Sequence, residues 1–418
     1  MARKRRRSTV VAPEFNGQQG LLAGKADTSG HDHPSAPSKE NTRERASASE
    51  PSKHHATVSV FWRLRYGGGR VSTFHVPVVD IAAYVQGGTP QEKAAVAAAI
   101  DTACREVGFI QILGHGVAPS AAEGLTAAMD DFFALPPAEK ARWRRPATEN
   151  RGYTPPKSET LALSAGVQSE TRMKDFLAFN IGSSVSDHPG ADLVAAHYAE
   201  NTWPTVPDFQ ARIDAWRTEA ARVARTMVTI FEDALDLERG TIASLAAHPI
   251  EVLRMNNYAL PEGTRVEVDE DMIGMGEHTD YGIVTILRAD RVKGLQVLHG
   301  GEWHDVSPAE GALLINLGDL TTRLTNEQWL STLHRVKPPI VDGTIQRRRS
   351  AAYFFDGDAE AMIGPLPRFI DEEHPRLYRD VSVDEHIAAK LAGSRAGVLN
   401  AAAGREAARV LTAGQPRR

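Results

Sequence analysis

The most regular pattern of hydrophobic and polar positions begins after Pro207. Large apolar residues recur there at every third or fourth position, which places them along one face of a helix. They are Phe209, Ile213, Trp216, Ala220, Val223, Met227 and Phe231. Asp208 is a candidate N-cap, and Gly240 follows the last turn. The stripe predicts a long helix that packs against a core and has no chemistry of its own.

Weaker patterns upstream predict two further helices and two strands. Residues 91–107 and 125–135 have apolar positions at helical spacing, and two prolines close the second helix. Residues 75–81 and 109–113 are short apolar runs of the kind found in strands.

The pattern changes at residue 251. From there, short runs rich in Val, Ile, Leu and Tyr are separated by Gly, Asp, Asn and Pro. The runs are 251–258, 283–287, 295–298, 312–317, 334–337 and 350–355. Such spacing is typical of an antiparallel sandwich or jelly roll. Because helices come first and strands follow, we predict an α+β fold, with a jelly-roll core (a double-stranded β-helix) and N-terminal helices packed against it.

Composition narrows the class of protein. The chain has 418 residues, of which 42% are hydrophobic, enough for a sizeable core. Residues 1–55 are poor in large apolar residues and hold ten Lys and Arg against six Asp and Glu, a net charge of +4. Since this segment cannot bury enough surface to offset its ordering entropy, we predict a disordered tail. The overall net charge of −5 leaves −9 for the remainder, so we expect no nucleic-acid partner.

The cysteine content and the hydropathy of the chain indicate its cellular compartment. Cys104 is the single cysteine, so an internal disulfide and a cysteine-rich metal site are both excluded, as fits a reducing cytoplasm. No apolar run approaches the roughly 20 residues of a membrane helix. The basic residues 3–7 lack the apolar segment that follows in a secretory signal. We therefore expect a cytoplasmic protein without a membrane partner.

Three side chains are candidate metal ligands. His278 and Asp280 are two residues apart, so on a strand or its frayed end both point to the same side and can reach one ion. His334 stands 54 positions beyond Asp280, at the start of another predicted strand. Two imidazoles and one carboxylate leave other positions of an octahedron open, which suits Fe(II) enzymes that bind O2. An isolated His-Thr-Asp is more often a polar strand end, so the motif needs support from elsewhere in the chain.

That support comes from a candidate anion site. Arg348 and Ser350 lie on one face of a predicted strand, where a guanidinium and a hydroxyl can bind a carboxylate. Arg349 should face the other way. Upstream, Asn256 and Tyr258 share a face of the first strand of the sandwich.

Together these motifs resemble the isopenicillin N synthase-like branch of the 2-oxoglutarate and Fe(II)-dependent oxygenases. That branch has His-x-Asp, a gap of about fifty residues and then His, followed by Arg-x-Ser, with Asn-x-Tyr upstream. The resemblance covers roughly residues 74–375 and includes further segments in the expected order. These are 76–80, 104–109, 114–117, 294–297 and 315–319.

The resemblance implies a site and a reaction. Catalysis would take place at Fe(II) held by His278, Asp280 and His334. The far carboxylate of 2-oxoglutarate would meet Arg348 and Ser350 with help from Tyr258, and Asn256 would lie near its iron-side end. With O2, the enzyme would oxidise a small-molecule metabolite and release succinate and CO2. Candidates for the substrate wall, each of which also suits a core or rim position, are Tyr153, Lys174, Phe176, Leu287 and Phe354.

The resemblance also suggests how the chain is divided. We expect a tail at 1–55, an N-terminal oxygenase region at 74–190, the jelly-roll domain at 191–375, and a C-terminal helical segment and tail at 376–418. His115 is left out of the ligand set, because the corresponding loop of the family is structural.

Several outcomes share these motifs and stay open. Hydroxylation, desaturation and ring closure use the same triad, as does isopenicillin N synthase, an oxidase that needs no 2-oxoglutarate. An ethylene-forming enzyme and an inactive oxygenase are further alternatives. A redox-inert metal-binding jelly roll would not need the Arg-x-Ser motif. The primary substrate and the oligomeric state are not fixed by the sequence.

Overall fold

The computed structural model describes residues 74–156, 164, 177–188, 197–259, 274–396 and 398–412. Every described residue belongs to the unit Thr57–Arg418. The expected tail at 1–55 lies outside the described residues. So do the wall candidates Lys174 and Phe176.

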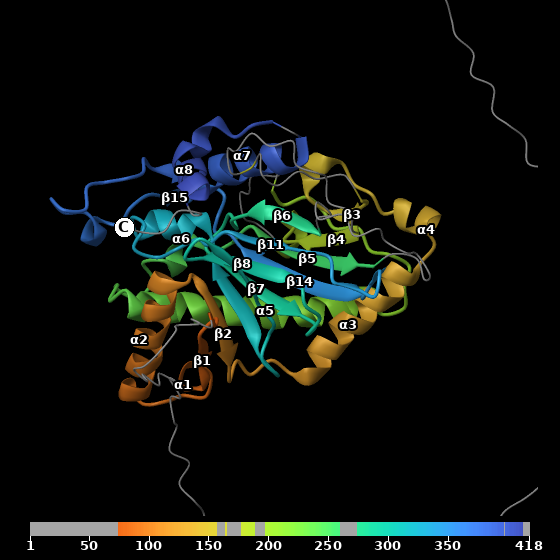
Figure 1. Cartoon of the computed structure of the whole chain (residues 1–418), viewed down its shortest axis with the longest axis horizontal. Coiled ribbons are helices and arrows are strands. Elements are labelled where there is room, and N and C mark those ends of the chain that lie inside the picture. The colour runs from red at the N-terminus through yellow and green to blue at the C-terminus, as the bar shows by residue number, and fades with distance from the viewer. Residues whose placement is uncertain are drawn as a thin grey trace, which may run out of the picture. The chain divides into compact units, whose positions relative to one another are not determined.

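Two sheets form the centre of the described unit (Figure 1). The larger has the strand order β1 (Val78–Asp80), β2 (Phe109–Leu113), β10 (Leu313–Leu317), β7 (Val284–Ala289), β14 (Arg348–Phe355), β5 (Glu251–Tyr258), β4 (Leu177–Gly182) and β3 (Gly152–Thr154). The smaller has the order β6 (Met275–His278), β11 (His334–Val336), β8 (Leu295–His299) and β9 (Glu302–Asp305). Apart from the parallel pair β1–β2, neighbouring strands in both sheets are antiparallel. This is the predicted jelly roll.

Apolar side chains from both sheets fill the space between them. Phe109 and Tyr258 of the larger sheet pack in one cluster with Val297 and Val336 of the smaller sheet. The inner faces of the two sheets therefore enclose a small core of their own, next to the cavity described below.

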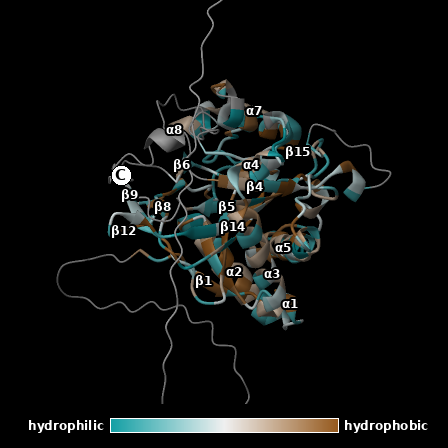
Figure 2. Ribbon diagram, turned by 90° about the vertical axis from the view of Figure 1, so that its right-hand side faces the viewer, coloured by the Kyte–Doolittle hydropathy of each residue, from teal (hydrophilic) through white to brown (hydrophobic). Residues whose placement is uncertain are grey.

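The N-terminal helices cover one side of the larger sheet. They are α2 (Pro90–Glu106), α3 (Pro119–Ala134) and α5 (Phe209–Ala234), and hydrophobic residues gather around α2 and its neighbouring strands in Figure 2. Every apolar residue of the predicted stripe on α5 is buried. The period of the sequence thus predicted both the helix and the face that it buries.

The ends of the helices differ from the prediction. Asp208 is the N-cap residue of α5, but its φ is 53° and its side chain makes no capping hydrogen bond. The helix ends at Ala234, and Gly240 (φ 92°) lies in the turn that follows, not at the cap. A capping box of Thr89 and Glu92 opens α2. The predicted N-cap position is therefore confirmed without the expected side-chain hydrogen bond, whereas the helix ends at Ala234, before Gly240 is reached.

The C-terminal segment is helical where the structure describes it. It contains α7 (Val383–Ala396) and α8 (Gly404–Thr412), which lie on the opposite side of the strands from α2, α3 and α5 in Figure 1. The remaining short elements are α1 (Ala82–Val85), α4 (Pro137–Ala141), α6 (Asp319–Leu324), β12 (Ile340–Val341), β13 (Thr344–Ile345), β15 (Met362–Ile363) and β16 (Val381–Ser382). Among the described helices, none is long and apolar enough to cross a membrane.

The larger sheet takes strands from both sides of residue 190. Strands β1 to β4 precede it and β5, β7, β10 and β14 follow it, joined by one continuous ladder of hydrogen bonds. The division of the chain at 190 therefore stays a prediction about sequence segments, because both segments share one sheet.

Candidate active site

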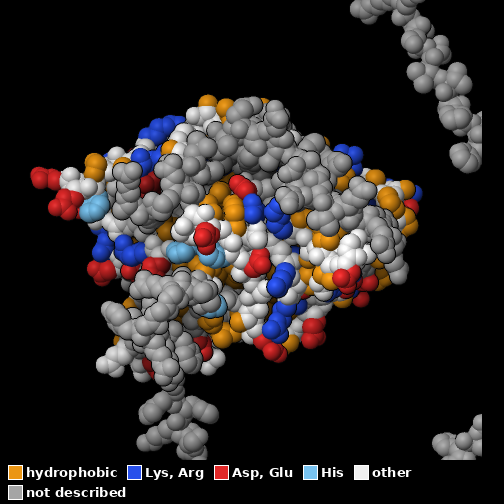
Figure 3. All heavy atoms as spheres, viewed as in Figure 1, with side chains coloured by type: hydrophobic (Ala, Val, Ile, Leu, Met, Phe, Trp, Pro, Cys, Tyr) orange, Lys and Arg blue, Asp and Glu red, His pale blue; other side chains and the backbone are white. Residues whose placement is uncertain are grey.

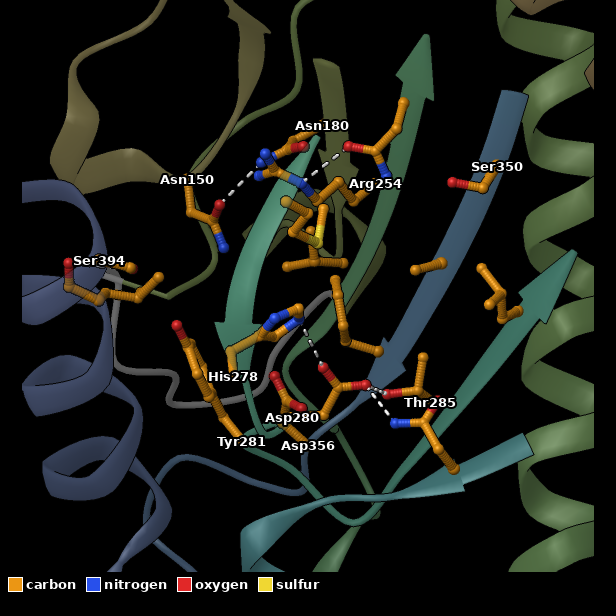
Figure 4. A pocket seen from close by; sticks show the side chains of 18 of the residues that line it. Asn150, Asn180, Arg254, His278, Asp280, Tyr281, Thr285, Ser350, Asp356 and Ser394 are labelled. Carbon is orange, nitrogen blue, oxygen red and sulfur yellow. Dashed lines mark hydrogen bonds and ion pairs between the residues drawn. The ribbon is translucent and has the colours of Figure 1, made fainter. Parts of the chain in front are cut away.

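One cavity lies against the inner face of the larger sheet (Figure 4). Strands β5 and β14 are neighbours, and on each of them every second residue lines it, as the two-residue period of a strand requires. These residues are Val252, Arg254, Asn256 and Tyr258 on β5, and Arg348, Ser350, Ala352 and Phe354 on β14. As predicted, Asn256 and Tyr258 lie on one face of β5, and Arg348 and Ser350 lie on one face of β14.

The three predicted ligands meet at this cavity. His278 ends β6 and lies directly opposite His334, which begins β11; their ring centroids are 4.2 Å apart. Asp280 follows two residues later and bridges to Gly318. The three potential ligand atoms lie within 4.8 Å of one another, and all three residues are buried. In the described part of the chain, no other group of three His, Cys, Asp or Glu has this arrangement.

Hydrogen bonds leave one atom of each side chain directed at the shared centre. Nδ1 of His278 pairs with the carbonyl oxygen of Gly276 at 2.7 Å, and Nδ1 of His334 pairs with that of Thr332 at 3.0 Å. Because a carbonyl oxygen only accepts, Nδ1 of each ring is the donor in these hydrogen bonds, and Nε2 is the nitrogen that is left for the shared centre. Both Nε2 atoms lie 3.6–3.7 Å from Oδ1 of Asp280. Two imidazole nitrogens and a carboxylate oxygen are thus placed to bind a cation.

The second oxygen of Asp280 is already occupied. Oδ2 accepts hydrogen bonds from Oγ1 of Thr285 and Nδ2 of Asn316, both at 2.5 Å (Figure 4). This fixes the carboxylate and leaves Oδ1 for a metal ion. Burial, followed by the neighbouring His334, lowers the pKa of His278, which keeps its ring neutral.

A buried ion pair supports the strand that carries the ligands. Nζ of Lys390, on α7, lies 2.7 Å from Oδ2 of Asp319, and their side chains are 1% and 0% exposed. The same Oδ2 accepts a hydrogen bond from Oγ1 of Thr279 at 3.0 Å, and the Asp319 N–H donates to the carbonyl oxygen of Asp280 at 2.8 Å. Helix α7 is thereby tied to Asp280, a candidate ligand, and to its neighbour Thr279.

A cationic site lies on the cavity-facing side of β14, at the beginning of that strand. Arg348 is 2% exposed, yet its Nε and Nη1 have no hydrogen-bond partner among the described residues. Its guanidinium carbon lies 5.2 Å from the centre of the Tyr258 ring, and Ser350 is the next residue on its side of β14. A buried guanidinium with unpartnered donors calls for an anion, and a carboxylate is the kind of anion that a guanidinium binds well.

Arg349 points away from the cavity, as the strand period predicted. Its guanidinium binds Asp130 at 2.8 Å and lies 3.6 Å from Asp290, and its side chain is 28% exposed. Basic and acidic side chains are interspersed on the face seen in Figure 3. Arg349 therefore makes surface ion pairs and takes no part in the cavity.

The remaining predicted residues divide between cavity and core. Leu287 and Phe354 line the cavity. The placement of Tyr153 in the wall is wrong for the described cavity, because β3 turns this ring into the core, edge-on to Phe132 with ring centroids 6.1 Å apart. The ring of His115 pairs with the carbonyl oxygen of Gly311. His115 is not part of the group of three candidate ligands, which agrees with its exclusion from the predicted ligand set.

Several residues of the site have roles that the sequence motifs did not predict. Thr285 and Asn316 orient Asp280, and Asp319 pairs with Lys390. Asn316 and Asp319 both fall in a segment that carried the family resemblance, which was the available signal. Asp356 also lines the cavity, where burial, Asp280 and Glu251 raise its pKa to about 8. Asp356 lies an even number of residues beyond Arg348 and Ser350, so the two-residue period of a strand could have predicted that it faces the same cavity.

Comparisons with known proteins agree with this site. Residues 76–206 match a family model described as non-haem dioxygenase in morphine synthesis N-terminal, and residues 250–357 match one described as 2OG-Fe(II) oxygenase superfamily. The chain is 31% identical over 300 residues to gibberellin 20 oxidase 2 of Oryza sativa, covering 72% of each chain. It is 30% identical over 330 residues to the 2-oxoglutarate-dependent dioxygenase citB of Monascus ruber, covering 76% of this chain and 94% of citB.

Solved structures share the fold. A full-length Neurospora crassa protein in complex with alpha-KG superposes with a TM-score of 0.66 at 24% identity, over 78% of this chain and 98% of that protein. The dioxygenase for auxin oxidation from rice gives a TM-score of 0.58 at 24% identity, over 79% of this chain and 99% of that protein.

Proposed function

Because this chain belongs to the 2-oxoglutarate and Fe(II)-dependent oxygenase family, we propose that it oxidises a small-molecule metabolite at an iron ion held by His278, Asp280 and His334. Membership makes it a non-haem iron dioxygenase that uses Fe(II), 2-oxoglutarate and O2. The assignment of individual residues to these partners is our proposal.

The donor set fits Fe(II). Two imidazole nitrogens and one carboxylate oxygen converge on one side of a point in the cavity, and hydrogen bonds have already fixed all three. Such a facial set leaves positions open for a chelating co-substrate and for O2. Because hydrogen bonds orient the three side chains before a metal binds, metal binding would require little reorganisation.

The observation that carries the co-substrate assignment is the buried guanidinium of Arg348, two of whose donors have no partner among the described residues. A buried cation with two free donors is costly unless a bound anion supplies the acceptors. We propose that the far carboxylate of 2-oxoglutarate is that anion, with Ser350 and Tyr258 beside it and Asn256 nearer the iron. This arrangement favours a 2-oxoglutarate-dependent enzyme over an isopenicillin N synthase-like oxidase.

The bound metal and co-substrate together would supply the oxidising power, with release of succinate and CO2. The chain's own residues hold and orient these groups. Leu287, Leu295, Val336 and Phe109 line the same cavity as the triad and Arg348. These apolar walls exclude water from the reacting groups and strengthen each charged contact inside.

We further propose that the enzyme acts in the cytoplasm on a freely diffusing substrate, without a nucleic-acid or membrane partner. Cys104, the single cysteine of the chain, is free and buried, which supports a reducing compartment. The net charge of −5 gives no general attraction to nucleic acid.

Turnover of 2-oxoglutarate tests the proposal. The full-length protein with Fe(II), 2-oxoglutarate and air is expected to release succinate, and a member of a metabolite panel is expected to stimulate that release. The same assay with Asp280→Ala should give none. Oxidation of a panel member without consumption of 2-oxoglutarate would contradict the proposal and favour the oxidase.

A further inference from the structure

Asp356 is a buried acid of the cavity that the iron and co-substrate sites do not use. It follows β14 directly, lines the cavity and is 6% exposed. Its N–H donates to the carbonyl oxygen of Ile250 at 3.0 Å, which continues the ladder between β14 and β5. Any side chain at Gly282 would collide with its carboxyl group, so this glycine leaves room for it beside the ligand segment. Figure 4 shows Asp356 next to Asp280.

The carboxyl group of Asp356 has no hydrogen-bond or ion-pair partner among the described residues. Other buried acids nearby are satisfied: Asp358 accepts from two backbone N–H groups, and Asp319 pairs with Lys390. The charged side chains that act most on Asp356 are Asp280 and Glu251, which are both acidic. A buried carboxyl group in such surroundings calls for a donor from outside the chain, preferably a cation.

The proposed cofactors do not supply that cation. The two positive charges of Fe(II) are matched by Asp280 and by the near carboxylate of 2-oxoglutarate, and Arg348 matches the far carboxylate. The other arginines that line the cavity are Arg151, Arg254 and Arg395, and none of them forms an ion pair or hydrogen bond with Asp356, so its carboxyl group is left over. The primary substrate is the remaining occupant of the cavity.

Resting on the proposed function, we propose that Asp356 binds a protonated amine of the primary substrate beside the iron. The substrate class is then a small basic metabolite, whose ammonium group favours the ionised form of this carboxyl group and makes a charge-assisted hydrogen bond with it. The bond fixes which carbon of the substrate faces the metal, so Asp356 determines specificity.

The test uses three probes that share an n-propyl group: n-propylammonium, 1-propanol, and N,N,N-trimethylpropylammonium, which has the charge but no N–H and a bulkier head group. The full-length protein is loaded anaerobically with Fe(II) and 2-oxoglutarate, and each probe is titrated while its effect on the visible charge-transfer band is followed. Propylammonium should half-saturate at a concentration about tenfold or more below that of either other probe, since hydrogen bonds between charged groups are the stronger ones.

Two variants and a control assign the preference to Asp356. Asp356→Asn keeps the shape and an acceptor but loses the charge, and Asp356→Leu loses both; each should bind the three probes within about twofold of one another. Ser394→Ala removes a polar group from the α7 wall of the same cavity and should retain the preference.

Equal binding of the three probes by the unaltered protein would overturn the proposal. So would a preference for propylammonium that survives in Asp356→Leu, or in Asp356→Asn, where it would show that a neutral acceptor is enough. If the unaltered protein shows no charge-transfer band before any probe is added, the proposed function itself fails, which separates the two outcomes.

Discussion

Replacement of Arg348 by alanine is expected to raise the 2-oxoglutarate requirement by about 30-fold or more. The guanidinium is 2% exposed and has two donors without partners among the described residues, so a bound carboxylate would depend on it. Its loss leaves that carboxylate unpaired in a cavity walled by Leu287, Leu295 and Val336. Truncating one partner of such a pair costs about 2–5 kcal/mol, and each tenfold change in affinity corresponds to about 1.4 kcal/mol.

Two further variants calibrate this effect. Arg348→Lys keeps the charge but loses the planar pair of donors, so its 2-oxoglutarate requirement should fall between those of the alanine variant and the unaltered enzyme. Arg349→Ala is the matched control from the neighbouring position on β14. That side chain binds Asp130 on the outer surface, where an ion pair contributes about 1 kcal/mol or less.

The assay is an anaerobic titration of each Fe(II)-loaded variant with 2-oxoglutarate, followed by the visible charge-transfer band. Iron affinity should change little in all three variants, because no proposed ligand is altered. Equal effects at 348 and 349 would refute the assignment of faces to β14. No effect at either position would refute the carboxylate site.

Three other perturbations follow from the structure. His278→Ala or Asp280→Ala should abolish turnover while circular dichroism shows a retained fold; an active variant with iron still bound would contradict the ligand assignment. Lys390→Met leaves Asp319 charged and buried, so it should lower the free energy of unfolding in urea by about 3–5 kcal/mol and weaken iron binding, and adding Asp319→Asn should restore part of both. Deletion of residues 1–55 should leave iron binding and turnover unchanged; a loss of either would show that the tail contributes to the site.

The sequence predicted those parts of the fold that depend on local periodicity. The helical stripe beginning at Phe209 identified α5, and the two-residue period placed Arg348 and Ser350 inward and Arg349 outward on β14. These predictions held because burial of one face is a property of the segment itself, whichever element it packs against.

Other features depend on contacts that no local pattern encodes. Lys390 meets Asp319 across 71 positions, and Asn316 meets Asp280 across 36. Tyr153 has an aromatic side chain that suits a cavity wall or a core equally well, and only the pairing of β3 with β4 turns it toward Phe132. Asp356 was overlooked because an aspartate after a strand is ordinarily a solvated turn residue.

The most direct measurement adds Fe(II) and then 2-oxoglutarate to the purified chain without oxygen and records the visible spectrum. If His278, Asp280 and His334 hold iron and Arg348 holds the co-substrate, a charge-transfer band should appear only after both additions, and it should be absent in Asp280→Ala. No band in the unaltered protein, or a spectrum that 2-oxoglutarate does not change, would contradict the account.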